Sequence, residues 1–226
     1  MKQVHSFLLL CAAVFTFFSC KKSNDAGSPA VNWNEDLKGT VWAGEFKYTS
    51  GDFQDLQPFT LMLNSDGTTT WTDMDSPRSG GSWKVQGDKI TLTFPNKTIN
   101  SATVSKDNWL DFTNPAVNGF EIASLNRSVA VTQSMLEGAT WSGFYKTDTW
   151  SIKFVAGSKA DLTRISKIPG LPYQASGASI KFIVNGGTFT DSFFATFYSN
   201  LTLMKVFRFY RNGTIINREM WSGQKQ

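Results

Sequence analysis

Hydrophobic and polar residues alternate in short stretches through most of the chain beyond residue 36. Phe59, Leu61 and Leu63 occupy every second position, and Trp150 and Ile152 begin the same pattern in the second half. A period of two places every second side chain on one face, which is typical of β-strands with one buried face. Beyond the N-terminal segment we expect only one short turn of helix, at residues 133–137.

The alternating pattern predicts a meander of short strands separated by turns rich in Gly, Pro, Asn and Asp. In the first half we expect strands at residues 42–48, 59–64, 68–74, 82–86, 89–94, 98–105, 108–113 and 120–125, separated by turns at residues 65–67, 79–81, 87–88, 95–96, 106–107 and 115–119. In the second half we expect turns at residues 157, 169–172, 177, 186–187, 199–200 and 212–213. Asn212-Gly213 is a specific hairpin signal, because both residue types tolerate positive φ.

The two halves of the chain are related by an internal repeat. Leu37–Gly44 reads LKGTVWAG and recurs at Leu136–Gly143 as LEGATWSG, with Leu, Gly, Trp and Gly at a constant offset of 99 positions. Trp83–Ile90 likewise parallels Tyr173–Ile180. Matches that follow one order indicate two copies of one structural unit, which we place at residues 36–130 and 131–226.

About eight strands joined in sequence order can remove their exposed edges by closing into an up-and-down barrel. We therefore expect an all-β protein of two tandem small antiparallel up-and-down β-barrels. The Gly-x-x-Trp-x-Gly motif of the first strand and a later Gly-x-Trp strand resemble lipocalin-like (calycin) domains. The resemblance covers residues 37–126 and 136–221 and implies that Trp42 and Trp141 close the barrel floors. Each copy has about 90 residues, fewer than typical lipocalins, which implies a small cavity.

The N-terminus predicts export. A charged start and an apolar run from Phe7 to Phe18, shorter than the roughly 20 residues that span a membrane, form a signal peptide at residues 1–19. The segment around Ser19-Cys20 resembles the relaxed lipobox of Bacteroidetes-type lipoproteins. It implies cleavage before Cys20, acyl chains such as palmitate on that residue, and a flexible linker over residues 20–35. The alternative is an ordinary signal peptide with Cys20 as a passive thiol.

This reading places the protein in the cell envelope. We expect the lipid at Cys20 to hold it in the outer membrane, on the periplasmic face or at the cell surface. Nucleic acid is not an expected partner for such a protein, and the sequence leaves the oligomeric state open.

Charge is divided unevenly between the halves. Residues 20–134 carry 10 basic and 13 acidic residues, whereas residues 135–226 carry 11 basic and 5 acidic residues. The halves could dock against each other, the basic half could face an anionic surface, or both could be ordinary solvated faces.

Side chains for catalysis or metal binding are scarce. His5 and Cys11 lie in the segment expected to be removed, which leaves no histidine and only Cys20 as a thiol. A mature chain of this composition offers no His or Cys–His base and no zinc site. We therefore expect no catalytic residue, no metal and no cofactor, and a protein that is not an enzyme.

We interpret the remaining acidic candidates as turn residues. Asp73 and Asp75 lie two apart beside Arg78, where a solvated turn is the favoured interpretation over a catalytic pair, and Asp107 and Asp111 are similar. Residues 65–67 favour a hairpin turn over a calcium loop.

The chain is rich in aromatic residues, and the hypothesis about its function rests on them. The candidate ligand-binding residues are Trp42, Trp83, Trp141 and Tyr173. The first hypothesis is lipocalin-like binding of a small apolar or amphipathic ligand at a barrel mouth or between the barrels. The alternative is a structural or interaction lipoprotein that recognises glycan or protein through surface loops. A cavity above about 300 Å³ would favour the first hypothesis, and packed interiors would favour the second.

One strand of the second copy has aromatic residues on both faces, at Phe193-Phe194 and Phe197-Tyr198. One of these faces must meet the companion barrel, a partner or a ligand, because water solvates such a face poorly.

Overall fold

The structure is a computed structural model, and it describes residues 31–51, 54–75, 77–95, 99–104, 109–112 and 119–226. Residues Trp33–Gln226 form one compact unit. The predicted signal peptide and Cys20 lie outside the described residues. No helix among the described residues has the length and apolar character needed to cross a membrane.

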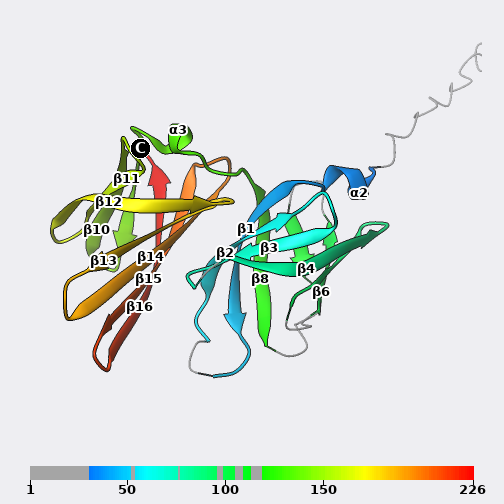
Figure 1. Ribbon diagram of the computed structural model, residues 1–226, viewed down its shortest axis with the longest axis horizontal. Coiled ribbons are helices and arrows are strands. Elements are labelled where there is room, and N and C mark those ends of the chain that lie inside the picture. Colours follow the sequence, from blue (N-terminus) through cyan, green and yellow to red (C-terminus); the bar gives the residue numbers. More distant parts are fainter. Residues whose placement is uncertain (1–30, 52–53, 76, 96–98, 105–108, 113–118) are drawn as a thin grey trace, which may run out of the picture. The chain divides into compact units, whose positions relative to one another are not determined.

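The described chain folds into two closed antiparallel barrels of eight strands each, which confirms the all-β prediction (Figure 1). Barrel 1 follows the short helix α2 (Trp33–Asp36) and comprises β1 (Thr40–Tyr48), β2 (Gln57–Leu63), β3 (Thr68–Thr72), β4 (Pro77–Gln86), β5 (Lys89–Thr93), β6 (Ile99–Val104), β7 (Trp109–Phe112) and β8 (Phe120–Ser128). Each strand pairs with the next along the chain, and β8 pairs with β1.

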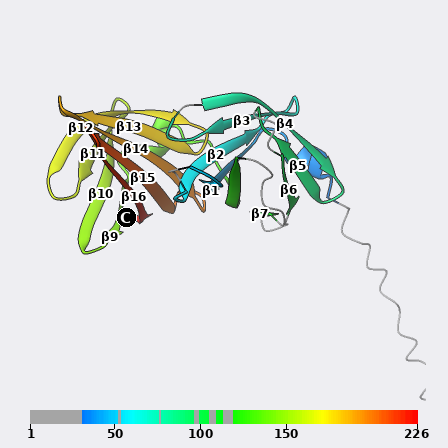
Figure 2. The same cartoon turned by 90° about the horizontal axis from the view of Figure 1, so that it is seen from below.

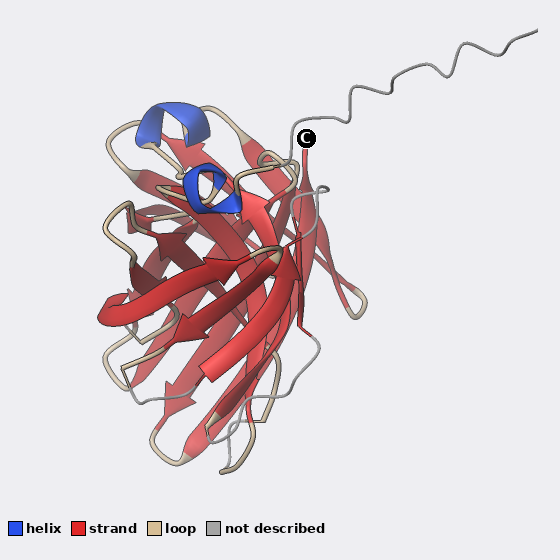
Figure 3. Cartoon of the chain, turned by 90° about the vertical axis from the view of Figure 1, so that its right-hand side faces the viewer, coloured by secondary structure: helices blue, strands red, loops and turns tan. Residues whose placement is uncertain are grey.

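Barrel 2 repeats this order (Figure 2). It follows helix α3 (Gln133–Leu136) and comprises β9 (Thr140–Tyr145), β10 (Asp148–Val155), β11 (Lys159–Thr163), β12 (Lys167–Ser176), β13 (Ser179–Asn185), β14 (Phe189–Tyr198), β15 (Leu203–Asn212) and β16 (Ile215–Lys225). Both helices are single turns that precede a first strand (Figure 3). The helix at residues 133–137 was predicted, whereas α2 lies where we expected only linker.

Three predicted turns need correction. Residues 79–81 and 169–172 lie inside β4 and β12, because Gly80 and Gly170 adopt φ of 99° and 66° and each strand carries a register shift opposite its partner. A positive-φ glycine lets a strand absorb a β-bulge without ending. The third correction concerns the last hairpin. The hairpin itself is confirmed, but its two-residue turn is Gly213-Thr214 and not residues 212–213.

The Gly-x-x-Trp-x-Gly motif has a structural cause at the point where each barrel closes. Gly44 on β1 pairs with Leu125 of β8, and Gly143 on β9 pairs with Gly223 of β16. A Cβ atom built on Gly44 would lie 2.2 Å from the Ser124 carbonyl oxygen, and one on Gly143 would lie 2.1 Å from the Ser222 carbonyl oxygen. The first and last strands therefore approach too closely for any side chain at these positions.

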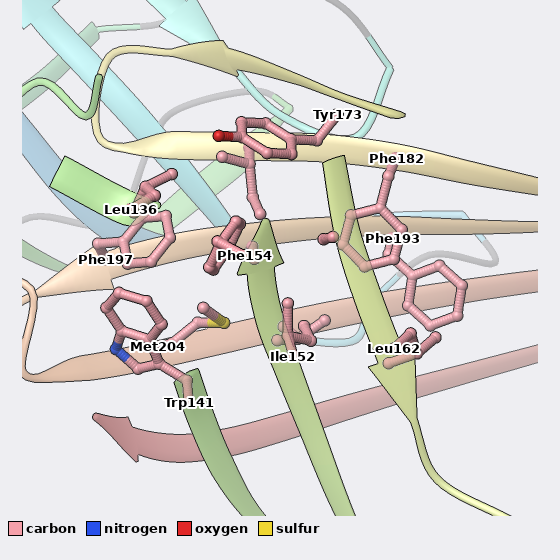
Figure 4. Close-up of a cluster of buried hydrophobic side chains, with 14 of the residues drawn as sticks. Leu136, Trp141, Ile152, Phe154, Leu162, Tyr173, Phe182, Phe193, Phe197 and Met204 are labelled. Carbon is pink, nitrogen blue, oxygen red and sulfur yellow. The ribbon is translucent and has the colours of Figure 1, made fainter. Parts of the chain in front are cut away.

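The tryptophan of the same motif fills the floor of each barrel, which we define as the end where the helix enters. Trp42 and Trp141 are 1% and 0% exposed. The Trp141 indole nitrogen donates to the Leu201 carbonyl at 3.0 Å, and the Trp42 nitrogen donates to the Thr40 hydroxyl at 2.8 Å. In barrel 2 this indole lies beside Phe154 and Phe197 (Figure 4).

Strand β14 has aromatic side chains on both faces, and the two faces contact different barrels. Phe193 and Phe197 belong to the core of barrel 2, whereas Tyr198 packs with Val41 and Ala43 of barrel 1. The Tyr198 hydroxyl is buried and donates to the Gly44 carbonyl at 2.9 Å. The companion barrel therefore covers one face of β14.

We call the contact between the first and last strand of each barrel its seam. The close approach there predicts that alanine destabilises the protein more at a seam glycine than at a glycine in an open turn. We expect Gly44→Ala or Gly143→Ala to reduce the free energy of unfolding by about 3 kcal/mol, because the added methyl group meets backbone that cannot move aside. Gly157→Ala, in a turn with φ 79° and open space around it, should cost only about 1 kcal/mol of backbone strain. Urea denaturation of the three variants measures the difference, and equal losses would contradict the seam argument.

Candidate functional site

The end of each barrel opposite its floor is the mouth, where β1–β2, β3–β4, β5–β6 and β7–β8 connect in barrel 1. A cavity of about 190 Å³ opens at the mouth of barrel 1. Aromatic side chains dominate its lining, and one carboxylate and one guanidinium join them: Phe46, Tyr48, Trp71, Asp73, Arg78, Phe94, Pro95, Gly119 and Phe120.

The aromatic walls hold one another in place. Trp71 stacks on Phe59 with ring centroids 3.8 Å apart and planes 12° from parallel. Phe46 and Phe94 meet the Trp71 ring edge-on, at 5.0 and 5.3 Å. Edge-to-face contacts such as those of Phe46 and Phe94 are a favoured arrangement of aromatic rings. The cavity walls are therefore formed before any ligand arrives.

Asp73 lies at the wall of this cavity and is only 3% exposed. Its Oδ2 accepts a hydrogen bond from the Trp71 indole nitrogen at 2.8 Å, and its Oδ1 accepts from the Asp75 amide at 2.9 Å. The prediction of a solvated turn was therefore wrong for Asp73. Its position two residues after Trp71 puts both side chains on the inner face of the sheet, where a buried carboxylate needs these donors.

Arg78 completes the polar part of the rim. Its Nη2 lies 3.0 Å from Asp75 Oδ2 and 3.4 Å from Asp73 Oδ2, and its side chain is 47% exposed. Partial burial acts to lower the pKa of Arg78, but the combined effect of Asp73, Tyr48 and Asp75 raises it. A permanently charged guanidinium thus stands half in solvent beside an aromatic cavity.

The mouth of barrel 2 is lined by an ion-pair network. Arg208 binds Asp191 through two nitrogens, with Nε to Oδ1 at 2.8 Å and Nη2 to Oδ2 at 2.7 Å. Glu219 Oε2 accepts from Arg208 at 3.1 Å, from Arg164 at 2.9 Å and from the Trp221 indole at 3.0 Å. Burial raises the pKa of Asp191, against the opposing effect of Arg208. The network therefore lies at the end of barrel 2 that corresponds to the mouth of barrel 1.

Aromatic rings support this network from the barrel interior. The Arg164 guanidinium carbon lies 5.1 Å from the Trp221 ring centroid and 5.3 Å from that of Tyr145, both within cation–π range. An open hollow of about 300 Å³ lies above the network, bordered by Ile165 and Ile168. The charged side chains that line it pair with one another, but the buried Arg164 Nε has no hydrogen-bond partner among the described residues.

The four residues proposed for ligand binding all lie toward the barrel floors, away from the cavity. Trp42 and Trp141 close the floors, and Trp83 is 6% exposed with its indole nitrogen on the Asn64 carbonyl at 3.0 Å. Tyr173 is 7% exposed, and burial raises the pKa of its hydroxyl. The structure brings Trp83 into the core of barrel 1 and Tyr173 into the core of barrel 2. Their role in ligand binding stays a prediction.

The other acidic candidates are the turn at residues 65–67 and the pair Asp107 and Asp111. Asp66 Oδ1 accepts from the Thr68 amide at 2.9 Å and from its hydroxyl, which lowers the pKa of Asp66 and confirms the hairpin turn at residues 65–67. Asp107 and the side chain of Asp111 lie outside the described part of the structure. Among the side chains that are described, no cluster of three metal-ligating residues occurs.

Comparison with models of protein families, with curated proteins and with solved structures gives no match. The fold and the site are therefore interpreted from their own geometry.

The ion-pair network of barrel 2 yields a stability prediction. Asp191→Leu leaves the Arg208 guanidinium short of its bidentate partner, and we expect a loss of about 2 kcal/mol, less than for a fully buried pair because both side chains keep some solvent contact. Adding Arg208→Met should recover most of this loss, since removal of both partners leaves no unpaired charge. Denaturant unfolding of the single and double variants measures both effects. A double variant as unstable as the single one would contradict this account.

Proposed function

We propose that this protein is a non-enzymatic binding protein that takes a small apolar or amphipathic molecule at the mouth of barrel 1. One observation carries the proposal: barrel 1 has an aromatic cavity with a charged pair at its rim, whereas the hollow at the mouth of barrel 2 is lined by an ion-pair network. Apolar concavities with a few convergent polar groups are the usual form of small-molecule sites.

The size of the cavity limits the ligand. Its volume of about 190 Å³ is below the roughly 300 Å³ at which drug-sized ligands are accommodated. It is close to the engineered apolar cavity of about 150 Å³ that binds benzene in another protein. A ligand portion about the size of one ring fits, and any longer portion would extend out of the mouth.

The rim adds a preference for a polar end. Trp71 and the Asp75 amide already donate to Asp73, whereas Arg78 is half exposed and carries more donors than its two carboxylate contacts use. An acceptor on the ligand, such as a carboxylate, therefore suits this rim better than an ammonium group.

We extend the proposal to the location of the protein in the cell. We propose an exported lipoprotein of the outer membrane, anchored through acyl chains at Cys20, with the barrels outside the bilayer. The residues around Ser19-Cys20 and the apolar run before them support this part.

Ligand binding can be tested with three probes of one ring size: toluene, benzoate and benzylamine. We expect saturation-transfer NMR to detect toluene and benzoate in the cavity, with benzoate the tighter of the two and benzylamine the weakest. Arg78→Gln should remove the advantage of benzoate over toluene, because it removes the charge but keeps a polar side chain.

A cavity-narrowing variant provides the control for position. Phe120→Trp adds bulk to the cavity wall and should weaken toluene binding roughly tenfold, whereas Phe189→Trp on barrel 2 should leave it unchanged. Absence of binding by all three probes, or equal losses in the two Trp variants, would refute ligand binding at this mouth.

A further inference from the structure

Large exposed hydrophobic side chains gather on the connections at the mouth of barrel 2. Ile165, between β11 and β12, is 88% exposed, and Ile215 and Ile216, which start β16, are 58% and 45% exposed. Alternate connections of an up-and-down barrel lie at the same end, so the β9–β10, β11–β12, β13–β14 and β15–β16 turns all surround this mouth. Exposed apolar groups at turn tips have no role in the core of either barrel.

The charge of this mouth is positive. The four connections, each taken with two residues on either side, carry four basic residues and one acidic residue: Lys146, Arg164, Lys167, Arg211 and Asp148. Asp148 lies 3.4 Å from Arg164, and Lys167 lies 2.9 Å from Asp161 of β11, so each of these charges is partly neutralised. The carboxylates inside the mouth, Asp191 and Glu219, are held by arginines.

The mouth of barrel 1 has the opposite sign. Its four connections, taken in the same way, carry six acidic residues and three basic residues in the sequence. Barrel mouths of the same topology thus differ in charge, and the isoleucines occur on the basic one. Net charge alone would produce only a general preference for anions, but apolar tips among basic residues fit a surface that is both anionic and apolar below.

We propose that the mouth of barrel 2 docks on an anionic lipid surface. Ile165, Ile215 and Ile216 enter the boundary between headgroups and acyl chains, while Lys146 and Arg211 bind anionic headgroups. Lys146 and Arg211 are exposed, and no ion pair is found for them among the described residues. This docking is independent of the ligand site in barrel 1 and of a lipid at Cys20, and it orients the barrels on a membrane to which the chain is held.

Vesicle co-sedimentation tests the proposal. The chain from Lys21 to Gln226 is used, because the apolar N-terminal run would bind lipid by itself and residues 33–226 form one compact unit. We expect binding to phosphatidylcholine vesicles that contain phosphatidylglycerol, little binding to phosphatidylcholine alone, and weaker binding as salt is raised. Absence of binding to the anionic vesicles would overturn the proposal.

Two variants separate the apolar from the electrostatic contribution. The triple variant Ile165→Ser, Ile215→Ser, Ile216→Ser should lower the partition coefficient at least tenfold, since it removes the inserting side chains. Lys146→Glu with Arg211→Glu should lower it by a similar factor and remove most of the salt dependence. All these side chains are exposed, so folding should be unaffected, and thermal unfolding checks this.

Matched control variants carry the same kinds of substitution at positions away from the mouth of barrel 2. Leu56→Ser with Met135→Ser removes exposed apolar side chains away from this mouth, and Lys89→Glu with Lys159→Glu reverses exposed charges at the floor ends of the barrels. The apolar control should bind as the parent chain does, and the charge control should lose clearly less than the mouth variant. Equal losses in variants and controls would overturn the proposal. A parent chain that dimerises in sedimentation velocity, with the Ile variant monomeric and no vesicle binding, would assign the patch to self-association instead.

Discussion

Closure of each barrel depends on the contact between its first and last strands. At Gly44 and Gly143 the neighbouring carbonyl oxygen lies about 2.2 Å or less from where a Cβ would be. This close seam lets eight strands of a short repeat complete their hydrogen bonding without an exposed edge. It also fixes the following strand residues, so that Phe46 reaches the interior of barrel 1 at its mouth. The Gly44 carbonyl at this seam also accepts the hydrogen bond from Tyr198 of barrel 2.

The two barrels share a scaffold, but different side chains line their mouths. Barrel 1 uses mutually stacked aromatic rings, which pack against one another but leave a hollow because rigid rings cannot collapse into it. Barrel 2 uses long arginine side chains, whose guanidinium groups bridge two carboxylates and rest on Trp221 and Tyr145. The two mouths thus differ in their linings: one is an aromatic cavity, and the other is a hollow lined by ion pairs.

Strand β14 links these two roles. Its inward side chains belong to the core of barrel 2, and Tyr198 on its other face binds the Gly44 carbonyl at the seam of barrel 1. Desolvation of the Tyr198 hydroxyl raises its pKa well above the usual range, as expected for a buried phenol. A salt bridge between Lys205 and Glu45 adds a charged contact at the same boundary. The aromatic excess of β14 is therefore explained by two cores.

The sequence by itself determined the strand meander, the two copies and the tryptophans of the floors, because period-two alternation and short repeated motifs report local burial. It could not separate a turn from a bulge at residues 79–81 or 169–172, since glycine favours both. The sequence showed a surplus of aromatic residues but not which of them meet at a cavity: the cavity lies around Trp71, Asp73 and Arg78, and the role of the floor tryptophans in ligand binding stays a prediction. Only the tertiary structure decided which mouth has an aromatic cavity, because its lining comes from strands and turns that are far apart in the sequence and meet in space.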